Sequence, residues 1–90
     1  MNPDQKTAEQ SQLAPVVLEQ ITANDDTYIL IEWLVPEGDL VSVGEVIFSV
    51  ESSKAIEDVE ARHAGRLVDC VEAGGEYGVG DQLARIELVH

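Results

Sequence analysis

An internal repeat is the feature of this sequence that most restricts its fold. When the 90-residue sequence is aligned with itself at an offset of 36 positions, residues 35–51 (VPEGDLVSVGEVIFSVE) match residues 71–87 (VEAGGEYGVGDQLARIE). Five positions are identical: Val35/Val71, Gly38/Gly74, Val43/Val79, Gly44/Gly80 and Glu51/Glu87. Two copies are too few for a solenoid, which needs three or more units to bury a continuous core. The repeat therefore favours two similar halves packed face to face.

The apolar segments are short, rich in Val and Ile, and separated by glycine or acidic residues, which is the pattern of strands. No segment combines ten residues of helical periodicity with helix caps. We expect strands at 16–21, 28–35, 46–51, 55–61, 66–73 and 82–89. The predicted fold class is all-β, as a flattened barrel or sandwich of two quasi-symmetric antiparallel sheets.

The length allows one domain, because two cores within 90 residues would each be too small to offset the chain entropy lost on folding. Residues 1–14 are mostly polar, with Leu13 as their single large aliphatic side chain. Such a segment buries too little apolar surface to fold alone. We therefore expect a disordered tail over 1–14 and a folded domain over 15–90.

The charge of the chain excludes several classes of partner. Eighteen acidic residues against five basic ones give a net charge of −13, which repels nucleic acids and anionic membranes. The sequence contains no apolar run of about 20 residues and no secretory signal pattern, so we expect a cytosolic protein. Cys70 is the single cysteine and is predicted to be a buried packing residue.

Lys54 is the candidate chemical group. It lies at the break in the repeat, because a connecting segment follows Glu51 while the chain ends soon after Glu87. We expect residues 51–55 to form a hairpin tip at the end of the domain opposite the termini, with Ser52 and Ser53 bonding to nearby backbone. The other lysine, Lys6, lies in the expected tail. Lys54 is therefore the single amine side chain that the folded domain would display, although many hairpin lysines are merely solvated turn residues.

Ordered motifs surround this lysine. They are Trp33-Leu34-Val35, Glu37-Gly38-Asp39, Val41-Ser42-Val43-Gly44, Glu51-Ser52-Ser53-Lys54-Ala55, Gly65 and Gly78-Val79-Gly80-Asp81. In this order they resemble the biotinyl/lipoyl-attachment domain family over about residues 28–88. The resemblance implies the barrel-sandwich hybrid fold and covalent attachment of a cofactor to Lys54, with Glu51, Ser53 and Ala55 as the recognition context.

The residues beside the lysine indicate which cofactor the resemblance implies. Biotinyl domains resemble Ala-Met-Lys-Met, and the only methionine here is Met1. Lipoyl domains resemble Glu-Thr-Asp-Lys-Ala, which Glu51 and Ala55 match, so lipoate is favoured and biotin is the alternative. The sequence departs from the family pattern at the residue before the lysine and in the region of the first strand. Ser53 stands where an aspartate is usual, which removes a charge that a ligase could read, and residues 16–19 and 25–27 also differ.

The resemblance implies a swinging-arm carrier and not an enzyme. Lipoylated on Lys54 by a lipoate ligase or a lipoyl/octanoyl transferase, the domain would shuttle acyl or aminomethyl groups and electrons between the dehydrogenase and acyltransferase enzymes of a multienzyme system such as a 2-oxoacid dehydrogenase complex. The alternative of the same fold is a biotinyl carrier for a carboxylase or decarboxylase. The alternative of another class is an unmodified interaction or adaptor module.

Other polar residues do not form a catalytic or metal site in this interpretation. His63 has no Ser, Cys or Asp arrangement around it in the sequence and is predicted to be a turn residue. Glu57, Asp58 and Glu60 lack the ligand order of a calcium loop, so we predict a solvated strand face and no metal. Trp33 is predicted to fill a large share of the interior.

Overall fold

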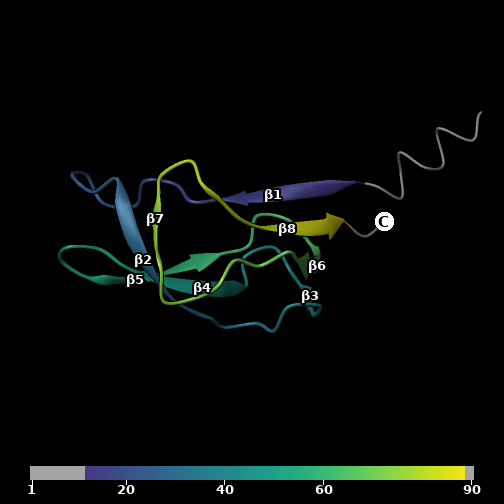
Figure 1. Cartoon of the computed structure of the whole chain (residues 1–90). Helices are drawn as coiled ribbons and strands as arrows, with labels where there is room; N and C mark the ends of the chain where they lie inside the picture. Colours follow the sequence, from purple (N-terminus) through teal and green to yellow (C-terminus); the bar gives the residue numbers. More distant parts are fainter. Residues whose placement is uncertain (1–11, 89–90) are drawn as a thin grey trace, which may run out of the picture.

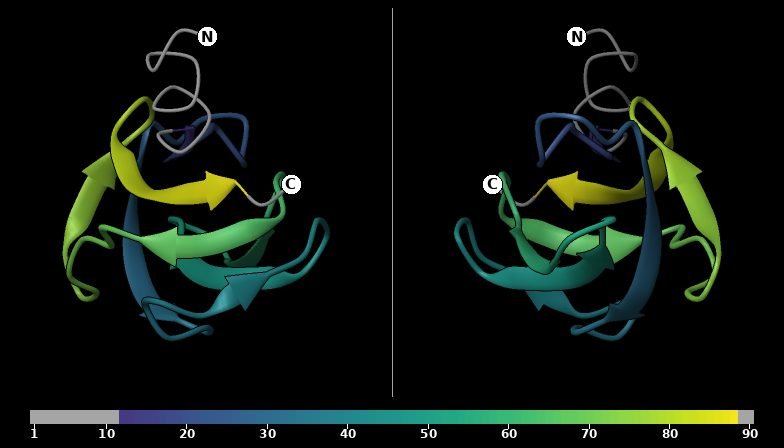
Figure 2. Two further views of the ribbon diagram at one scale, coloured as in Figure 1. Left: turned by 90° about the vertical axis from the view of Figure 1, so that its right-hand side faces the viewer. Right: turned by 90° about the vertical axis from the view of Figure 1, so that its left-hand side faces the viewer.

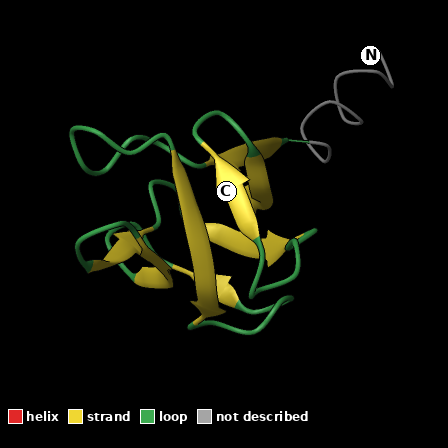
Figure 3. Cartoon of the chain, turned by 60° about the vertical axis from the view of Figure 1, so that its left-hand side comes forward, coloured by secondary structure: helices red, strands yellow, loops and turns green. Residues whose placement is uncertain are grey.

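The fold is built from strands throughout the part of the chain that the structure describes. The structure is a computed structural model, and it describes residues 12–88. Eight strands follow one another and no helix occurs among these residues (Figures 1 and 3). The strands are β1 (Leu13–Val17), β2 (Thr27–Trp33), β3 (Leu40–Val41), β4 (Val46–Glu51), β5 (Ile56–Glu60), β6 (Gly65–Val68), β7 (Glu76–Gly78) and β8 (Gln82–Leu88).

The strands form two four-stranded sheets with purely antiparallel pairing. One sheet has the order β1-β8-β6-β3 and the other has the order β5-β4-β2-β7. Figure 2 shows the two sheets curving around a shared interior when the molecule is viewed along its length. The predicted all-β fold of two antiparallel sheets is confirmed.

The two sheets are related by an approximate two-fold axis. Exchanging β1 with β5, β2 with β6, β3 with β7 and β4 with β8 converts one strand order into the other. The turns repeat as well: φ is +98° at Gly38 and +96° at Gly74, and +90° at Gly44 and +99° at Gly80. Positive φ is the conformation that glycine adopts without the steric cost of a Cβ atom. The repeat read from the sequence is therefore a repeat of backbone geometry.

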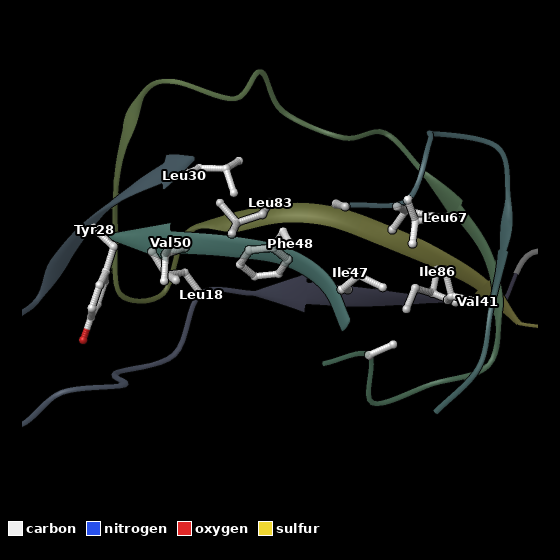
Figure 4. Close-up of a cluster of buried hydrophobic side chains, with 13 residues drawn as sticks. Leu18, Tyr28, Leu30, Val41, Ile47, Phe48, Val50, Leu67, Leu83 and Ile86 are labelled. Atoms are coloured by element: carbon white, nitrogen blue, oxygen red, sulfur yellow. The ribbon is translucent and has the colours of Figure 1, made fainter. Parts of the chain in front are cut away.

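Apolar side chains from both sheets fill the interior. Tyr28 and Phe48 are the largest of the fully buried side chains, each 1% exposed (Figure 4). The other residues buried to the same degree are Leu18, Leu30, Ile47, Val50, Leu67, Leu83 and Ile86. Trp33 does pack against this core, with its ring centroid 5.2 Å from that of Phe48, but it is only half-buried. The prediction that Trp33 fills the interior is thus wrong in degree, because Phe48 and Tyr28 occupy that space.

The largest differences between the observed strands and the predicted ones are found in three places. β1 begins at Leu13 and ends at Val17, so the domain starts two residues before the predicted position 15, and Ala14 is already buried. The remainder of the expected tail, residues 1–11, lies outside the described residues. β3 and β7 were not predicted, because strands of two and three residues have no apolar run of their own. β6 ends at Val68 and not at residue 73.

Cys70 is half-buried beside the core. Burial, together with the negative charges of Glu37 and Asp69, raises the pKa of the Cys70 thiol to about 11. The thiol is therefore protonated at neutral pH. Cys70 packs against the core as predicted, but the prediction that it is buried is wrong in degree, because it is only half-buried.

His63 is exposed in the segment between β5 and β6. The described residues contain no group of three His, Cys, Asp or Glu side chains arranged to hold a metal ion. Across residues 12–88 no helix is long and apolar enough to cross a membrane.

Candidate functional site

Lys54 lies at the tip of the hairpin that joins β4 to β5. The last paired residues of the two strands are Glu51 and Ile56, so residues 52–55 form the connecting turn. In Figure 1 this turn lies at the left end of the molecule, whereas β1 begins and β8 ends at the right. The symmetry explains the placement, because the pair Glu51–Ile56 corresponds to the pair Glu87–Leu13, where β8 approaches its last residue and β1 begins. The predicted hairpin tip is confirmed.

The side chain of Ser52 closes this turn. Its Oγ accepts hydrogen bonds from the backbone N–H groups of Lys54 (3.2 Å) and Ala55 (3.1 Å) and donates one to the carbonyl of Ala55 (3.1 Å). The backbone N–H of Ser52 donates to the same carbonyl at 2.8 Å. A hydroxyl that bonds nearby backbone in this way stabilises a tight turn. The backbone at Lys54 is therefore held, while its side chain is left to extend.

The Lys54 side chain is available for chemistry with an outside molecule. Lys54 is exposed, and within residues 12–88 it takes part in no ion pair. A groove of about 660 Å³ lies between β1 and β5, but none of residues 52–55 lines it. A primary amine on a stiff turn, away from a cavity that could enclose a substrate, suits modification by an enzyme that approaches from solvent.

The loop between β1 and β2 lies beside the lysine hairpin (Figure 1). Ser53 Oγ donates a hydrogen bond to Oδ2 of Asp25 in this loop, at 3.2 Å. The prediction that both tip serines bond to nearby backbone is thus confirmed for Ser52 and wrong for Ser53, whose hydroxyl bonds to a distant carboxylate. The same Oδ2 accepts a hydrogen bond from Thr22 Oγ1 at 2.6 Å. Asp25 therefore connects the β1–β2 loop to the residue before Lys54.

Hydrogen bonds hold the pKa of the Asp25 carboxyl below its ordinary value of 3.8. The bond from Thr22 contributes most and the bond from Ser53 follows, while partial desolvation opposes them and the Lys54 charge adds a smaller lowering. Asp25 is therefore ionised at neutral pH. Because the pKa is lowered in the folded state, the bonds to the carboxylate add stability above its ordinary pKa of 3.8, and this stability is lost as the pH falls through the folded-state pKa.

Tyr28 anchors the β1–β2 loop from the core. Its ring is buried, and Figure 4 shows its hydroxyl pointing away from the apolar cluster. The hydroxyl accepts hydrogen bonds from the backbone N–H groups of Ile21 (2.8 Å) and Thr22 (3.0 Å) and donates to the carbonyl of Asp25 (3.2 Å). One side chain thus sets the course of the loop that carries Asp25.

Replacing Tyr28 with Phe tests this anchor. We expect Tyr28→Phe to lower the free energy of unfolding by about 1–3 kcal/mol, because two partly buried backbone N–H groups lose their acceptor. Urea denaturation measures the loss, and hydrogen exchange should show faster exchange at the amides of Ile21 and Thr22. Tyr77→Phe is the matched control: the Tyr77 hydroxyl donates to the exposed carbonyl of Glu72, which water can satisfy. Equal losses in both variants would contradict the anchoring role.

The outer face of the sheet beside the tip combines acidic and apolar side chains. Ile29 pairs with Glu76 on one side and with Glu51 on the other, and Glu51 pairs with Ile56. Directly opposed residues on antiparallel strands point to the same face, so these four form one row across the sheet. Ile29 is 43% exposed and Ile56 is 63% exposed. The row gives the surface next to Lys54 a negative charge and an apolar contact area.

The predicted site residues lie together in the lysine hairpin, but they are not all of the residues that form the surface beside Lys54. Glu51, Ser53 and Ala55 surround Lys54 as neighbours in one hairpin, as their order in the sequence requires. Asp25, Thr22 and Tyr28 were not recognised as parts of the site from the sequence. Their contribution depends on a contact between residues 28 positions apart, and the one available signal was that residues 25–27 depart from the family pattern.

Comparison with protein families gives one match over most of the chain. The model for the family described as "Biotin-requiring enzyme" (Biotin_lipoyl) matches residues 18–86. This range covers six complete strands, β2 to β7, and most of β8. It contains the whole lysine hairpin.

Three similar proteins are components of pyruvate dehydrogenase complexes. The mitochondrial protein X component of Chaetomium thermophilum is 32% identical over 68 residues, covering 62% of this chain and 15% of that protein. The dihydrolipoyllysine-residue acetyltransferase component of Rhizobium meliloti is 44% identical over 50 residues (56% of this chain, 11% of that protein). The mitochondrial acetyltransferase component 3 of Arabidopsis thaliana is 43% identical over 54 residues (58% and 10%). The matched region thus spans about a tenth to a seventh of the length of these relatives.

The fold is similar to that of a solved lipoyl domain. The solution structure of the lipoyl domain of the 2-oxoglutarate dehydrogenase complex from Azotobacter vinelandii superposes with a TM-score of 0.66 at 19% sequence identity. The superposition covers 81% of this chain and 94% of that domain. Nearly the whole fold of that lipoyl domain therefore has its counterpart in this chain.

Proposed function

The chain belongs to the family of biotin- and lipoyl-attachment domains, and from this premise we propose that it is a non-catalytic carrier that bears a lipoyl group on Lys54. The observation that carries the proposal is the position of Lys54: it is exposed at the tip of a hairpin, at the one break in the two-fold repeat. Glu51 and Ala55 flank it as the lipoyl type of motif requires. The domain then contributes position and the attached group contributes reactivity.

The tip residues fit covalent attachment of a carboxylic acid. The Lys54 Nζ, when neutral, would attack the carboxyl carbon of an activated lipoate, forming an amide bond while the bond to the activating group breaks and the amine loses a proton. Ser52 holds the backbone of the turn during this reaction. When bound, the lipoyl group supplies a reversible disulfide that accepts an acyl or aminomethyl group together with electrons.

The partners follow from the proteins that this chain resembles. We propose modification by a lipoate ligase or a lipoyl/octanoyl transferase, and service to the dehydrogenase and acyltransferase enzymes of a 2-oxoacid dehydrogenase type of complex. A rigid tip with a flexible arm raises the effective concentration of the reactive group at each active site that it can reach. The cytosolic location predicted from the sequence stays a prediction.

The choice of cofactor can be tested by offering the chain to two ligases in separate reactions. Purified unmodified chain is incubated with lipoate ligase, lipoic acid and ATP, or with biotin ligase, biotin and ATP, and the intact mass is followed over time. We expect a lipoyl-sized adduct at one per chain and no biotin-sized adduct at the same enzyme concentration. A biotin-sized adduct formed faster would favour the biotinyl carrier of a carboxylase or decarboxylase, and no adduct with either ligase would favour an unmodified adaptor module.

A further inference from the structure

Ser53 does not use its side chain to close its own turn. Its hydroxyl instead donates to the carboxylate of Asp25, which reaches the tip from the β1–β2 loop. The contact joins two segments that are 28 residues apart. The surface beside Lys54 is therefore composite, because the hairpin provides the amine and another loop provides a charge.

The fold sets the position of this carboxylate independently of Ser53. Thr22 bonds to the same carboxylate oxygen, and the Tyr28 hydroxyl fixes the backbone at Ile21 and Thr22. At the start of the loop, the backbone N–H of Leu18 donates to the carbonyl of Asp81 at 2.9 Å, and its carbonyl accepts from the N–H of Gly80 at 2.8 Å. Bonds at the beginning and end of the loop thus hold Asp25 next to the lysine hairpin.

The hydrogen bond from Ser53 places the Asp25 carboxylate beside the residue that precedes Lys54. The pKa of Asp25 is lowered mainly by the hydrogen bonds from Thr22 and Ser53, and the positive charge of Lys54 makes the smallest contribution. The motif described from the sequence has an acidic residue immediately before the lysine, and here that position is the uncharged Ser53. The Asp25 carboxylate thus lies against the hydroxyl of Ser53, the residue that stands where the motif has an acidic side chain.

Resting on the proposed function, we infer that Asp25 is a specificity-determining residue of the lysine tip, whose carboxylate marks Lys54 for a modifying enzyme with a basic docking surface. Charges at the rim of an interface act chiefly on encounter and on salt dependence. The role of Asp25 is therefore to lower the KM of the ligase for this domain. The side chain has no part in the bond-forming step itself.

Replacing Asp25 with asparagine, which is uncharged but has a similar shape, separates the effect of the charge from the effect of the hydrogen bonds. In Asp25→Asn the amide oxygen can still accept from Thr22 and Ser53, while the charge is lost. We expect the kcat/KM of lipoate ligase, with lipoic acid and ATP as co-substrates, to fall about two- to five-fold through KM. The difference should vanish near 1 M salt, where charges are screened within about 3 Å.

Two further variants distinguish this role from a structural one. Asp26→Asn removes the same charge from the neighbouring exposed position, and we expect near-normal kinetics. Asp25→Asn combined with Ser53→Asp returns a carboxylate to the tip on the hairpin itself, and we expect kcat/KM to recover. Equal kinetics for Asp25→Asn and Asp26→Asn, or no recovery in the double variant, would overturn the inference. Absence of modification in the unaltered chain would instead refute the proposed function.

Discussion

Lys54→Arg is expected to abolish covalent modification of the chain completely while leaving its fold intact. Arginine keeps the positive charge, but its guanidinium is protonated at all accessible pH values and cannot act as an amine nucleophile. Within residues 12–88 the Lys54 side chain takes part in no ion pair, and the turn is closed by Ser52. The free energy of unfolding should therefore change by no more than about 0.5 kcal/mol.

The measurement is the intact mass of each variant after incubation with lipoate ligase, lipoic acid and ATP, combined with urea denaturation. Lys6→Arg is the matched control, because it alters the other lysine of the chain by the same chemistry. We expect full modification of Lys6→Arg and none of Lys54→Arg. An adduct that persists in Lys54→Arg would refute the assignment of the attachment site.

Gly65→Ala should produce the largest loss of stability among single substitutions considered for this fold. Gly65 is buried at the start of β6, paired with Leu88 on one side and Val41 on the other. A Cβ atom there would overlap the backbone carbonyl of Glu87 and lie 2.9 Å from Cγ2 of Ile86. Backbone cannot move aside as a flexible side chain can, so we expect a loss of about 3 kcal/mol or more. That is a large share of the roughly 5–15 kcal/mol that stabilises a small domain.

Gly78→Ala provides the control for this substitution. Gly78 also lies in a strand, but an added Cβ would meet only ordinary contacts, 3.7 Å from the carbonyl oxygen of Asp26 and 3.8 Å from Oδ2 of Asp81. We expect its free energy of unfolding to change by about 0.5 kcal/mol, measured by the same urea titration. Equal losses of stability in the two variants would contradict the explanation that β8 lies too close to Gly65 for a side chain to fit.

The two short strands that the apolar pattern missed follow the internal repeat. Shifting residues 40–41 by 36 positions gives 76–77, so the two short strands that were not predicted, β3 and β7, occupy equivalent places in the two copies. Neither has enough apolar residues to be recognised alone. They exist because the neighbouring turns at Gly38 and Gly74 return the chain to the sheet, where each strand pairs with a longer one.

The first strand shows how tertiary packing can displace a boundary. Residues 16–21 contain most of the apolar side chains in this region, yet the ladder to β8 runs from Leu13 to Val17. Leu18 fills the core from outside any strand, and its backbone bonds to Gly80 and Asp81. An apolar pattern records burial, and burial at Leu18 is achieved without a strand.

The place of Lys54 in the fold was predictable from the sequence, but the residues that surround it were not. Lys54 lies at the break in the repeat, and local turn chemistry places it at a tip. The contact between Ser53 and Asp25 depends on how the β1–β2 loop folds back over the Tyr28 hydroxyl. No local pattern encodes that path. The sequence therefore shows that position 53 lacks an acidic residue, but it does not show that the Asp25 carboxylate lies beside this position.

The central claim is that Lys54 carries a lipoyl group, and mass spectrometry of the natively expressed chain tests it most directly. Intact mass gives the size and number of adducts, and peptide mapping locates them. We predict one lipoyl-sized adduct per chain, confined to the peptide that contains Lys54. A biotin-sized adduct on that peptide, or an unmodified Lys54 in a host that lipoylates its other carrier domains, would contradict the claim.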